Sequence, residues 1–173
     1  MMKTADITQK DLENCIEAAL DLLYKMDQYL ICHRICHKGN SKLDELIGHV
    51  SERGIVFRFG IYFDSLFNHS ISAFYNIDTE YNRDRDAIKA YTSSEEPTRK
   101  QSMRRQYRYP DLIVHQRGND NHNLLVIEFK PWWSPNQEAD KTKVQHLKDS
   151  CQYTFGATIL ITKERKDCKI EFI

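Results

Sequence analysis

The N-terminal part of the chain places its apolar residues at helical spacing. From Thr8 to about Ile31 they recur every three or four positions, and either Thr8 or Asp11 has the side chain of a helix N-cap. The apolar face of this segment comprises Leu12, Ile16, Ala19, Leu20 and Leu23. We therefore expect a helix here, within a helical extension over residues 1–40 that precedes a core over residues 41–173.

A second helical pattern begins after Gly39-Asn40-Ser41 and carries a carboxylate on an apolar side. Ser41 and Asp44 resemble a helix start, and Glu52 falls in line with apolar residues farther along. These residues are Val56, Phe59 and Phe63. A carboxylate that points inward is costly to bury, so this position predicts a function for Glu52. The alternative is a surface glutamate where the helix bends at Gly54.

The pattern then changes to short apolar runs with the composition of strands. Residues 71–81 form the first run. Residues 110–115 and 124–130 flank Arg117-Gly118-Asn119-Asp120-Asn121, whose residues favour a turn, and together they predict an antiparallel hairpin. Because Asp111 and Glu128 lie equally far from the centre of this loop, we expect them to face each other across the two strands.

The last part of the chain completes an α/β fold. Ser134 or Asn136 begins a predicted helix, whose inward stripe comprises Asp140, Val144, Leu147 and Cys151. Residues 156–162 form a continuous apolar run, typical of a buried strand, and residues 169–173 alternate as in an edge strand. This order of elements predicts a mixed β-sheet with flanking helices.

Composition limits the compartment and the class of partner. A chain of 173 residues suits one domain, and Lys+Arg 25 against Asp+Glu 25 gives a formal net charge of +0, so any attraction to phosphate must be local. No apolar run has the length of a signal peptide core or a membrane span. Five cysteines without an export signal predict reduced thiols in a cytoplasmic protein with no membrane partner.

Charged side chains close the predicted hairpin at one end. Because side chains alternate along a strand, Glu128 and Lys130 share one face, while Ile127 and Phe129 point to the other. With Asp111 opposite Glu128, two carboxylates and an ammonium group come together. Such close carboxylates are costly unless a cation lies between them, and oxygen ligands suit Mg²⁺ or Mn²⁺. The alternative is that Asp111 merely starts a strand and Glu128 and Lys130 form an edge ion pair.

The polar connection over residues 84–108 contains the concentrated basic tract of the chain. We expect this connection to lack regular structure and to be mobile. The basic residues nearest the hairpin are Arg99, Lys100, Arg104, Arg105 and Arg108. These residues either contact phosphate groups or belong to a solvated charged loop, and the sequence favours neither alternative. Glu80 and Arg83 could bind DNA, brace the metal ligands or form an ion pair, and Lys141 and Lys143 are candidates for contact with a phosphate.

The segment Cys32-His33-Arg34-Ile35-Cys36-His37 suggests a metal site. Haem attachment requires two residues between the cysteines, and here there are three. A zinc site could use Cys32, Cys36 and His37, but no second cluster of ligands lies nearby in the sequence. We therefore expect partly packed residues at a helix end, with bound zinc as the alternative.

Pro110-Asp111 followed by Glu128-Phe129-Lys130 resembles the signature of the PD-(D/E)XK nuclease superfamily, which has the restriction-endonuclease-like fold. Longer segments are similar to a group of small bacterial proteins of that superfamily. These segments are Glu80-Tyr81-Asn82-Arg83, residues 109–118 and residues 123–130. The similarity runs from about Glu52 to about Ile161 and does not cover the N-terminal segment.

This resemblance implies one nuclease-like domain over residues 1–173 that hydrolyses phosphodiester bonds, in DNA rather than RNA. Asp111 and Glu128 would hold Mg²⁺ or Mn²⁺, Glu52 would complete the metal site, and Lys130 would orient the attacking water. The implied nucleic-acid-binding residues are Arg83, Arg104, Arg105, Arg108, Lys141 and Lys143. A homodimer is compatible with the resemblance. The alternative function is a non-catalytic nucleic-acid-binding or protein-interaction module on the same fold.

Overall fold

The computed structural model describes residues 7–31, 51–80, 83–84, 87–88, 109–134 and 137–173. The helices are α1 (Gln9–Met26), α2 (Gln28–Ile31), α4 (Glu52–Ser70) and α5 (Gln137–Cys151), and the short 3-10 helices are η2 (Asp120–His122) and η3 (Arg165–Asp167). The strands are β1 (Asn76–Thr79), β2 (Arg83–Asp84), β3 (Ala87–Ile88), β4 (Leu112–His115), β5 (Leu125–Pro131), β6 (Phe155–Ile161) and β7 (Lys169–Phe172). None of these helices combines the length and the apolar character that crossing a bilayer requires.

Five strands form a mixed sheet in the order β1-β4-β5-β6-β7, and β2 and β3 pair separately. Neighbouring strands of the large sheet run antiparallel except β5 and β6, which are parallel and are connected through α5. Parallel neighbours require such a crossover, usually through a helix. The predicted α/β fold with a mixed sheet and flanking helices is confirmed, as is the half-exposed edge strand β7.

Strands β4 and β5 form the predicted hairpin in the predicted register. The paired residues are Leu112–Ile127, Ile113–Val126 and Val114–Leu125. Asp111 lies in the bend immediately before β4, so the same register extended by one residue places it opposite Glu128. The symmetry of the loop in sequence was therefore sufficient to predict the pairing.

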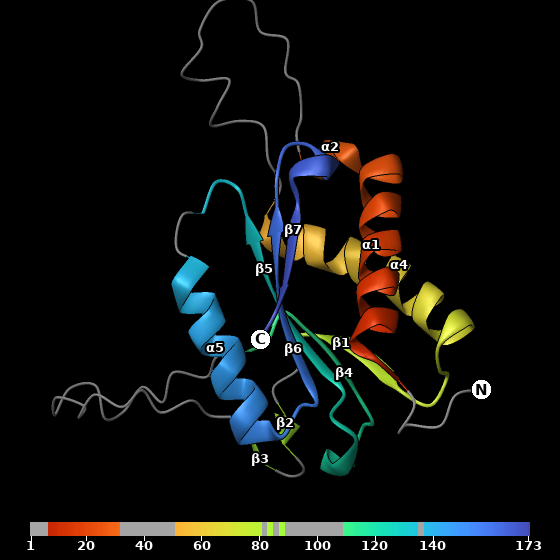
Figure 1. Ribbon diagram of the computed structural model, residues 1–173, viewed down its shortest axis with the longest axis vertical. Helices are drawn as coiled ribbons and strands as arrows, with labels where there is room; N and C mark the ends of the chain where they lie inside the picture. Colours follow the sequence, from red (N-terminus) through yellow and green to blue (C-terminus); the bar gives the residue numbers. More distant parts are fainter. Residues whose placement is uncertain (1–6, 32–50, 81–82, 85–86, 89–108, 135–136) are drawn as a thin grey trace, which may run out of the picture.

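The helices cover the two faces of the sheet, with α5 on one side and α1 and α4 on the other (Figure 1). On the α1 and α4 side, Ile127 and Phe129 join the larger apolar core, and the ring centroid of Phe129 lies 4.9 Å from that of Phe59. On the α5 side, Val126 packs with Val144 in a smaller core. Because side chains alternate along β5, Glu128 and Lys130 continue the row of Val126 and therefore face α5.

Gly156 in β6 allows α5 to approach the sheet closely. A Cβ atom at this position would lie 2.6 Å from Val144 Cγ1, which is shorter than any normal carbon–carbon contact. The glycine therefore sets how near α5, with its charged N-terminal half, lies to β5.

The first predicted helix is present but ends earlier than expected. Thr8 caps α1 through a capping box with Asp11, so both residues proposed for the cap take part in it. Asp27 then interrupts the helix before α2, which extends to Ile31. The Asp27 carboxylate accepts hydrogen bonds from Arg58 and from Tyr62 of α4. The break thus coincides with a contact between helices that local sequence does not reveal.

The predicted first strand, over residues 71–81, was too long. Helix α4 continues to Ser70, and the strand β1 begins only at Asn76. Ile71 and Tyr75 are buried in the core cluster, so their apolar side chains mark a turn packed against the core and not a strand. The connection after residue 84 also differs from expectation, because its start contributes the short β2–β3 ladder.

Candidate active site

The candidate site lies where β4 begins, on the face of the sheet that α5 covers. The backbone N–H of Phe129 donates a hydrogen bond of 2.7 Å to Asp111 Oδ2 and fixes this carboxylate against β5. Burial raises the pKa of Asp111, while the Phe129 N–H and the charge of Lys143 oppose the rise. The charge of Asp111 also raises the pKa of Glu128, so the two carboxylates lie close together, as the extended register of β4 and β5 requires.

Glu128 is a buried carboxylate, with only 3% of its surface exposed. Lys143 Nζ lies 2.6 Å from Glu128 Oε2 and also donates a hydrogen bond to the Tyr109 carbonyl oxygen. Glu128 Oε1 is buried and has no hydrogen-bond partner among the residues that the structure describes. Burial raises the pKa of Glu128 well above its ordinary value, the charge of Asp111 adds to the rise, and Lys143 opposes it. Such an oxygen is costly to bury unless it receives a proton or a cation.

Glu52 is the first residue of α4 and brings a third carboxylate to this region. The stripe predicted from the sequence is confirmed, since Val56, Phe59 and Phe63 are all buried and Glu52 is partly buried. Burial raises the pKa of Glu52, and the nearby negative charge of Asp111 raises it further. The N-terminus of a helix favours a carboxylate, so α4 partly offsets this cost.

Lys130 lies in the site and is paired with Asp140, a residue that we had not predicted as functional. The Lys130 ammonium is 2.8 Å from Asp140 Oδ2, although the pair does not have hydrogen-bond geometry. Both side chains are largely buried between β5 and α5. The signal was present in the sequence, because a carboxylate on the inward stripe of the last helix is as unusual as Glu52 on its own stripe.

The charges of these side chains do not balance. Glu52, Asp111, Glu128 and Asp140 supply four carboxylates against the two ammonium groups of Lys130 and Lys143, which leaves a formal charge of −2 when all are ionised. We refer to these six residues as the charged cluster. A divalent cation would neutralise it, and carboxylate oxygens are the ligands that Mg²⁺ and Mn²⁺ prefer.

Within the described ranges, no three Asp, Glu, His or Cys side chains converge as a ready-made metal ligand group. The donor set that fits a cation is instead the close pair Asp111 and Glu128, because Glu128 carries the buried oxygen without a partner. Glu52 lies near enough to feel the charge of Asp111.

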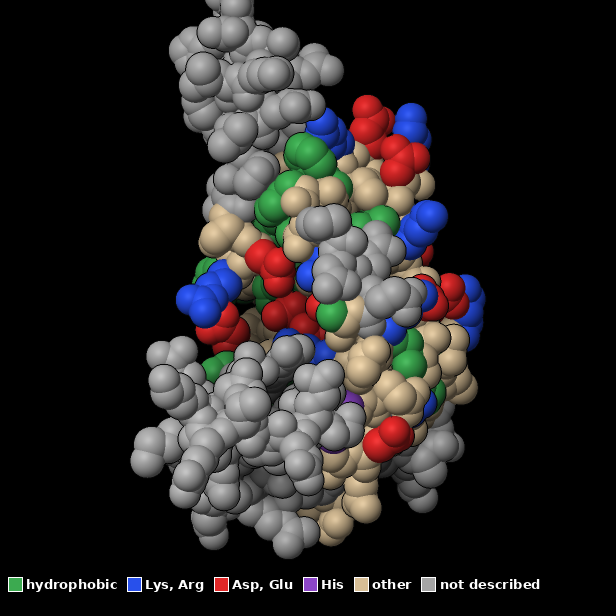
Figure 2. Space-filling model, turned by 90° about the vertical axis from the view of Figure 1, so that its left-hand side faces the viewer, with side chains coloured by type: hydrophobic (Ala, Val, Ile, Leu, Met, Phe, Trp, Pro, Cys, Tyr) green, Lys and Arg blue, Asp and Glu red, His purple; other side chains and the backbone are tan. Residues whose placement is uncertain are grey.

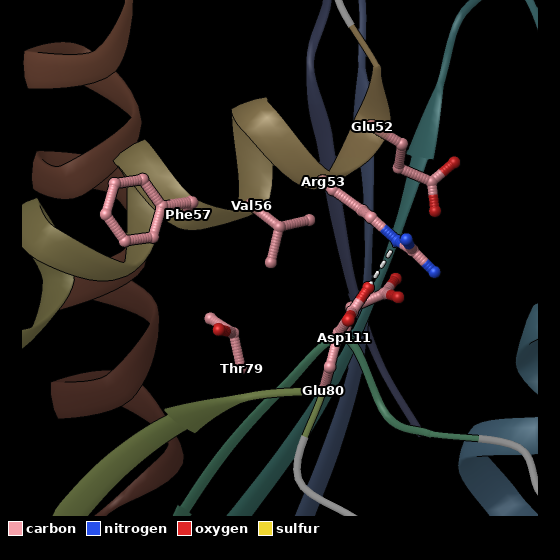
Figure 3. A pocket seen from close by; sticks show the side chains of 7 residues that line it. All are labelled: Glu52, Arg53, Val56, Phe57, Thr79, Glu80 and Asp111. Atoms are coloured by element: carbon pink, nitrogen blue, oxygen red, sulfur yellow. Dashed lines mark ion pairs between the residues drawn. The ribbon is translucent and has the colours of Figure 1, made fainter.

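A pocket of about 200 Å³ adjoins the charged cluster (Figure 3). Its lining residues are Glu52, Arg53, Val56, Phe57, Thr79, Glu80 and Asp111. Glu80 forms an ion pair of 2.6 Å with the exposed Arg53 at the rim, a partner that the sequence did not predict. Figure 2 shows acidic side chains gathered in a hollow near the middle of one face of the molecule.

The remaining predicted residues are placed as follows. Lys141 forms an ion pair of 2.7 Å with Glu171 of β7, and Lys143 is directed at Glu128 and not outward to solvent. Arg83 lies in β2, and its side chain is outside the part that is described. The other candidates also fall outside the described residues: Arg104, Arg105 and Arg108 of the basic tract, and Cys32, Cys36 and His37 of the suggested zinc site.

Comparisons with known proteins assign no family to the chain. No family model, no curated protein and no solved structure matches it. The resemblance to PD-(D/E)XK nucleases therefore rests on the motif residues alone and stays a prediction.

Proposed function

We propose that the protein is a divalent-metal-dependent nuclease with a restriction-endonuclease-like core. The observation that carries this proposal is the buried Glu128 oxygen that lacks a hydrogen-bond partner among the described residues, next to Asp111 in a cluster with an excess of carboxylates. Burying a carboxylate oxygen that has no hydrogen-bond partner destabilises the fold, and buried carboxylates with a raised pKa are typical of functional sites.

Asp111 and Glu128 would hold Mg²⁺ or Mn²⁺, with the carbonyl oxygen of Phe129 as a further donor and Glu52 reached directly or through water. The cation, when bound, would polarise a phosphoryl oxygen and help to form hydroxide from water. Lys130 would orient the attacking water and offset the charge that develops on the phosphoryl oxygens. Asp140 would keep the Lys130 ammonium at its position, 2.8 Å away.

The motif resemblance favours DNA over RNA as the substrate. The second candidate is a non-catalytic nucleic-acid-binding or protein-interaction module. In a nucleic-acid-binding module, two carboxylates that face the polyanion would repel it and weaken binding. A cation between the two carboxylates would remove this repulsion. The charged cluster therefore supports the nuclease over the binding module.

The proposal is tested by assaying cleavage of single- and double-stranded DNA and RNA with Mg²⁺ or Mn²⁺. Lys130→Ala should keep metal binding but lose about a hundredfold to a thousandfold in rate, as when one preorganised charge is removed from a reacting centre. Asp111→Asn should weaken metal affinity itself. Lys166→Ala and Asp64→Asn, at exposed positions away from the site, are the matched controls.

A protein that cuts no substrate, binds neither metal and is unaffected by Asp111→Asn would contradict the nuclease proposal. In that outcome the non-catalytic nucleic-acid-binding or protein-interaction module becomes the better proposal.

A further inference from the structure

We infer that the pocket between α4 and the end of β1 binds one unpaired nucleobase next to the charged cluster, so that the substrate is single-stranded or locally unpaired nucleic acid. This inference rests on the proposed function and adds the substrate class to it. The pocket and the charged cluster share Glu52 and Asp111. A phosphate held at the charged cluster would therefore have its neighbouring nucleotide at the pocket.

The pocket has an apolar wall at the end far from the carboxylates. Figure 3 shows Phe57 at one end and Asp111 at the other, with Val56 directed into the space between α4 and the end of β1. Val56 is buried, whereas Phe57 is 58% exposed, although burial of a phenylalanine is normally favourable. An exposed aromatic ring that lines a pocket beside a proposed phosphate site offers a surface on which a base can stack.

The rim supplies polar and charged groups for the edge of a base and for the backbone. Arg53 and Glu80 form their ion pair here, and the Arg53 side chain is 82% exposed. Thr79 lies at the end of β1 and adds a hydroxyl group. Arg53 can donate to a phosphate from this position, and Glu80 can accept from an exocyclic amino group.

The size of the pocket restricts what can enter it. About 200 Å³ is below the range of roughly 300–1,000 Å³ that is usual for sites of complete small ligands. One planar ring system fits this space better than a nucleotide with its sugar and phosphates. In a duplex both faces of each base are stacked and its edge is paired, so a base could enter only when it is unpaired or turned out of the helix.

Stacking on Phe57 does not distinguish DNA from RNA, because a base presents the same kind of aromatic face in both. The test therefore includes both kinds of strand. It also needs a probe that carries phosphates without bases, since the exposed Arg53 could bind the backbone alone.

The experiment measures binding by fluorescence anisotropy, with Ca²⁺ in place of Mg²⁺. The probes are labelled single-stranded DNA, single-stranded RNA, the DNA duplex and a DNA strand of equal length with abasic sites. Wild type should prefer the single strands over both the duplex and the abasic strand. Phe57→Ala should weaken single-strand binding by about fivefold to a hundredfold and remove the preference over the abasic strand. Phe57→Trp, which keeps an aromatic ring, should bind as wild type does.

Ile61→Ala is the matched control, because Ile61 is one turn farther along α4, is 43% exposed and does not line the pocket. Equal effects of Phe57→Ala and Ile61→Ala, or equally tight binding of the abasic strand by wild type, would overturn the inference. These results are independent of cleavage. If the protein binds single strands through Phe57 but cuts nothing, the inference about this pocket stands, and metal binding and Asp111→Asn decide the nuclease proposal. If the protein cuts nucleic acid but binds single strands, duplex and abasic strand equally, the nuclease proposal stands and this inference is wrong.

Discussion

Glu128 shows, at the scale of one residue, what the charged cluster costs the fold. Burial raises the pKa of Glu128 above its ordinary value of 4.5. At a pH between the ordinary pKa and the raised pKa of the folded protein, the native state therefore holds a proton that the unfolded chain releases. The stability without divalent metal should therefore fall as pH rises through this interval. Glu128→Gln should flatten this fall, because amide and carboxyl group have similar shape and the amide does not ionise.

The measurement is the free energy of unfolding in urea between pH 4.5 and 8, with EDTA present. Glu171→Gln, at an exposed position of the edge strand β7, serves as the control. A wild-type slope equal to that of Glu128→Gln would mean that Glu128 is not the buried titrating group described above.

Lys143 is the residue that partly neutralises Glu128. Lys143→Met removes the partner of a buried carboxylate, which typically costs about 3–5 kcal/mol, or less if Glu128 takes up a proton. Mn²⁺ should then raise the melting temperature of Lys143→Met by more than it raises that of wild type, because the cation neutralises the carboxylate that lost its ammonium partner. Lys141→Met, which breaks the partly exposed pair with Glu171, should cost about 1 kcal/mol and leave the Mn²⁺ effect unchanged. If Mn²⁺ raises the melting temperature of both variants equally, Glu128 does not belong to the metal site.

At the scale of elements, sequence reasoning succeeded where a local pattern decides the structure. The hairpin register followed from the alternation of apolar residues and the position of the loop, and the stripe through Glu52 followed from helical periodicity. It failed where the partner is distant in sequence. The break at Asp27 coincides with contacts to α4, and Ile71 and Tyr75 are apolar because a turn packs on the core.

The candidate site likewise contains residues that a local pattern predicts and contacts that depend on partners distant in sequence. Asp111, Glu128 and Lys130 could be predicted because they end two paired strands. The pairing of Lys143 with Glu128, and of Asp140 with Lys130, depends on how α5 lies across β5, which periodicity does not specify. The assignment of Lys143 to phosphate contact came from the motif resemblance and did not anticipate its pairing with the buried Glu128.

The position of α5 is itself testable through two glycines. Gly156→Ala should destabilise the protein by about 1–3 kcal/mol, because the new Cβ meets the stiff side chain of Val144 at 2.6 Å. Gly60→Ala in α4 should be neutral or stabilising by up to about 1 kcal/mol, since its Cβ would make ordinary contacts of 3.5 and 3.6 Å and alanine favours the helix.

Chemical denaturation measures both effects, and adding Val144→Ala to Gly156→Ala should recover part of the loss. If Gly156→Ala is as well tolerated as Gly60→Ala, α5 does not lie as closely on β6 as the structure shows.

At the scale of the whole molecule, the two faces of the sheet differ in what they contribute. The α1 and α4 side buries the larger apolar core, which includes Phe59, Phe63 and Phe129. The α5 side has a smaller core that ends in the charged cluster. The larger core provides the stability that a cluster of buried charges requires. The N-terminus of α4 brings Glu52 close to Asp111, and both residues line the pocket (Figure 3).

The central claim is that Asp111 and Glu128 hold a divalent cation, and Mn²⁺ binding followed by electron paramagnetic resonance tests it without knowledge of the substrate. The protein should bind about one or two Mn²⁺ ions, more tightly at pH 8 than at pH 5.5, because the cation displaces protons from carboxyl groups of raised pKa. Glu128→Gln and Asp111→Asn should each weaken this binding strongly, and Glu171→Gln should leave it unchanged. Binding that is absent in wild type, or that all three variants retain equally, would contradict the account.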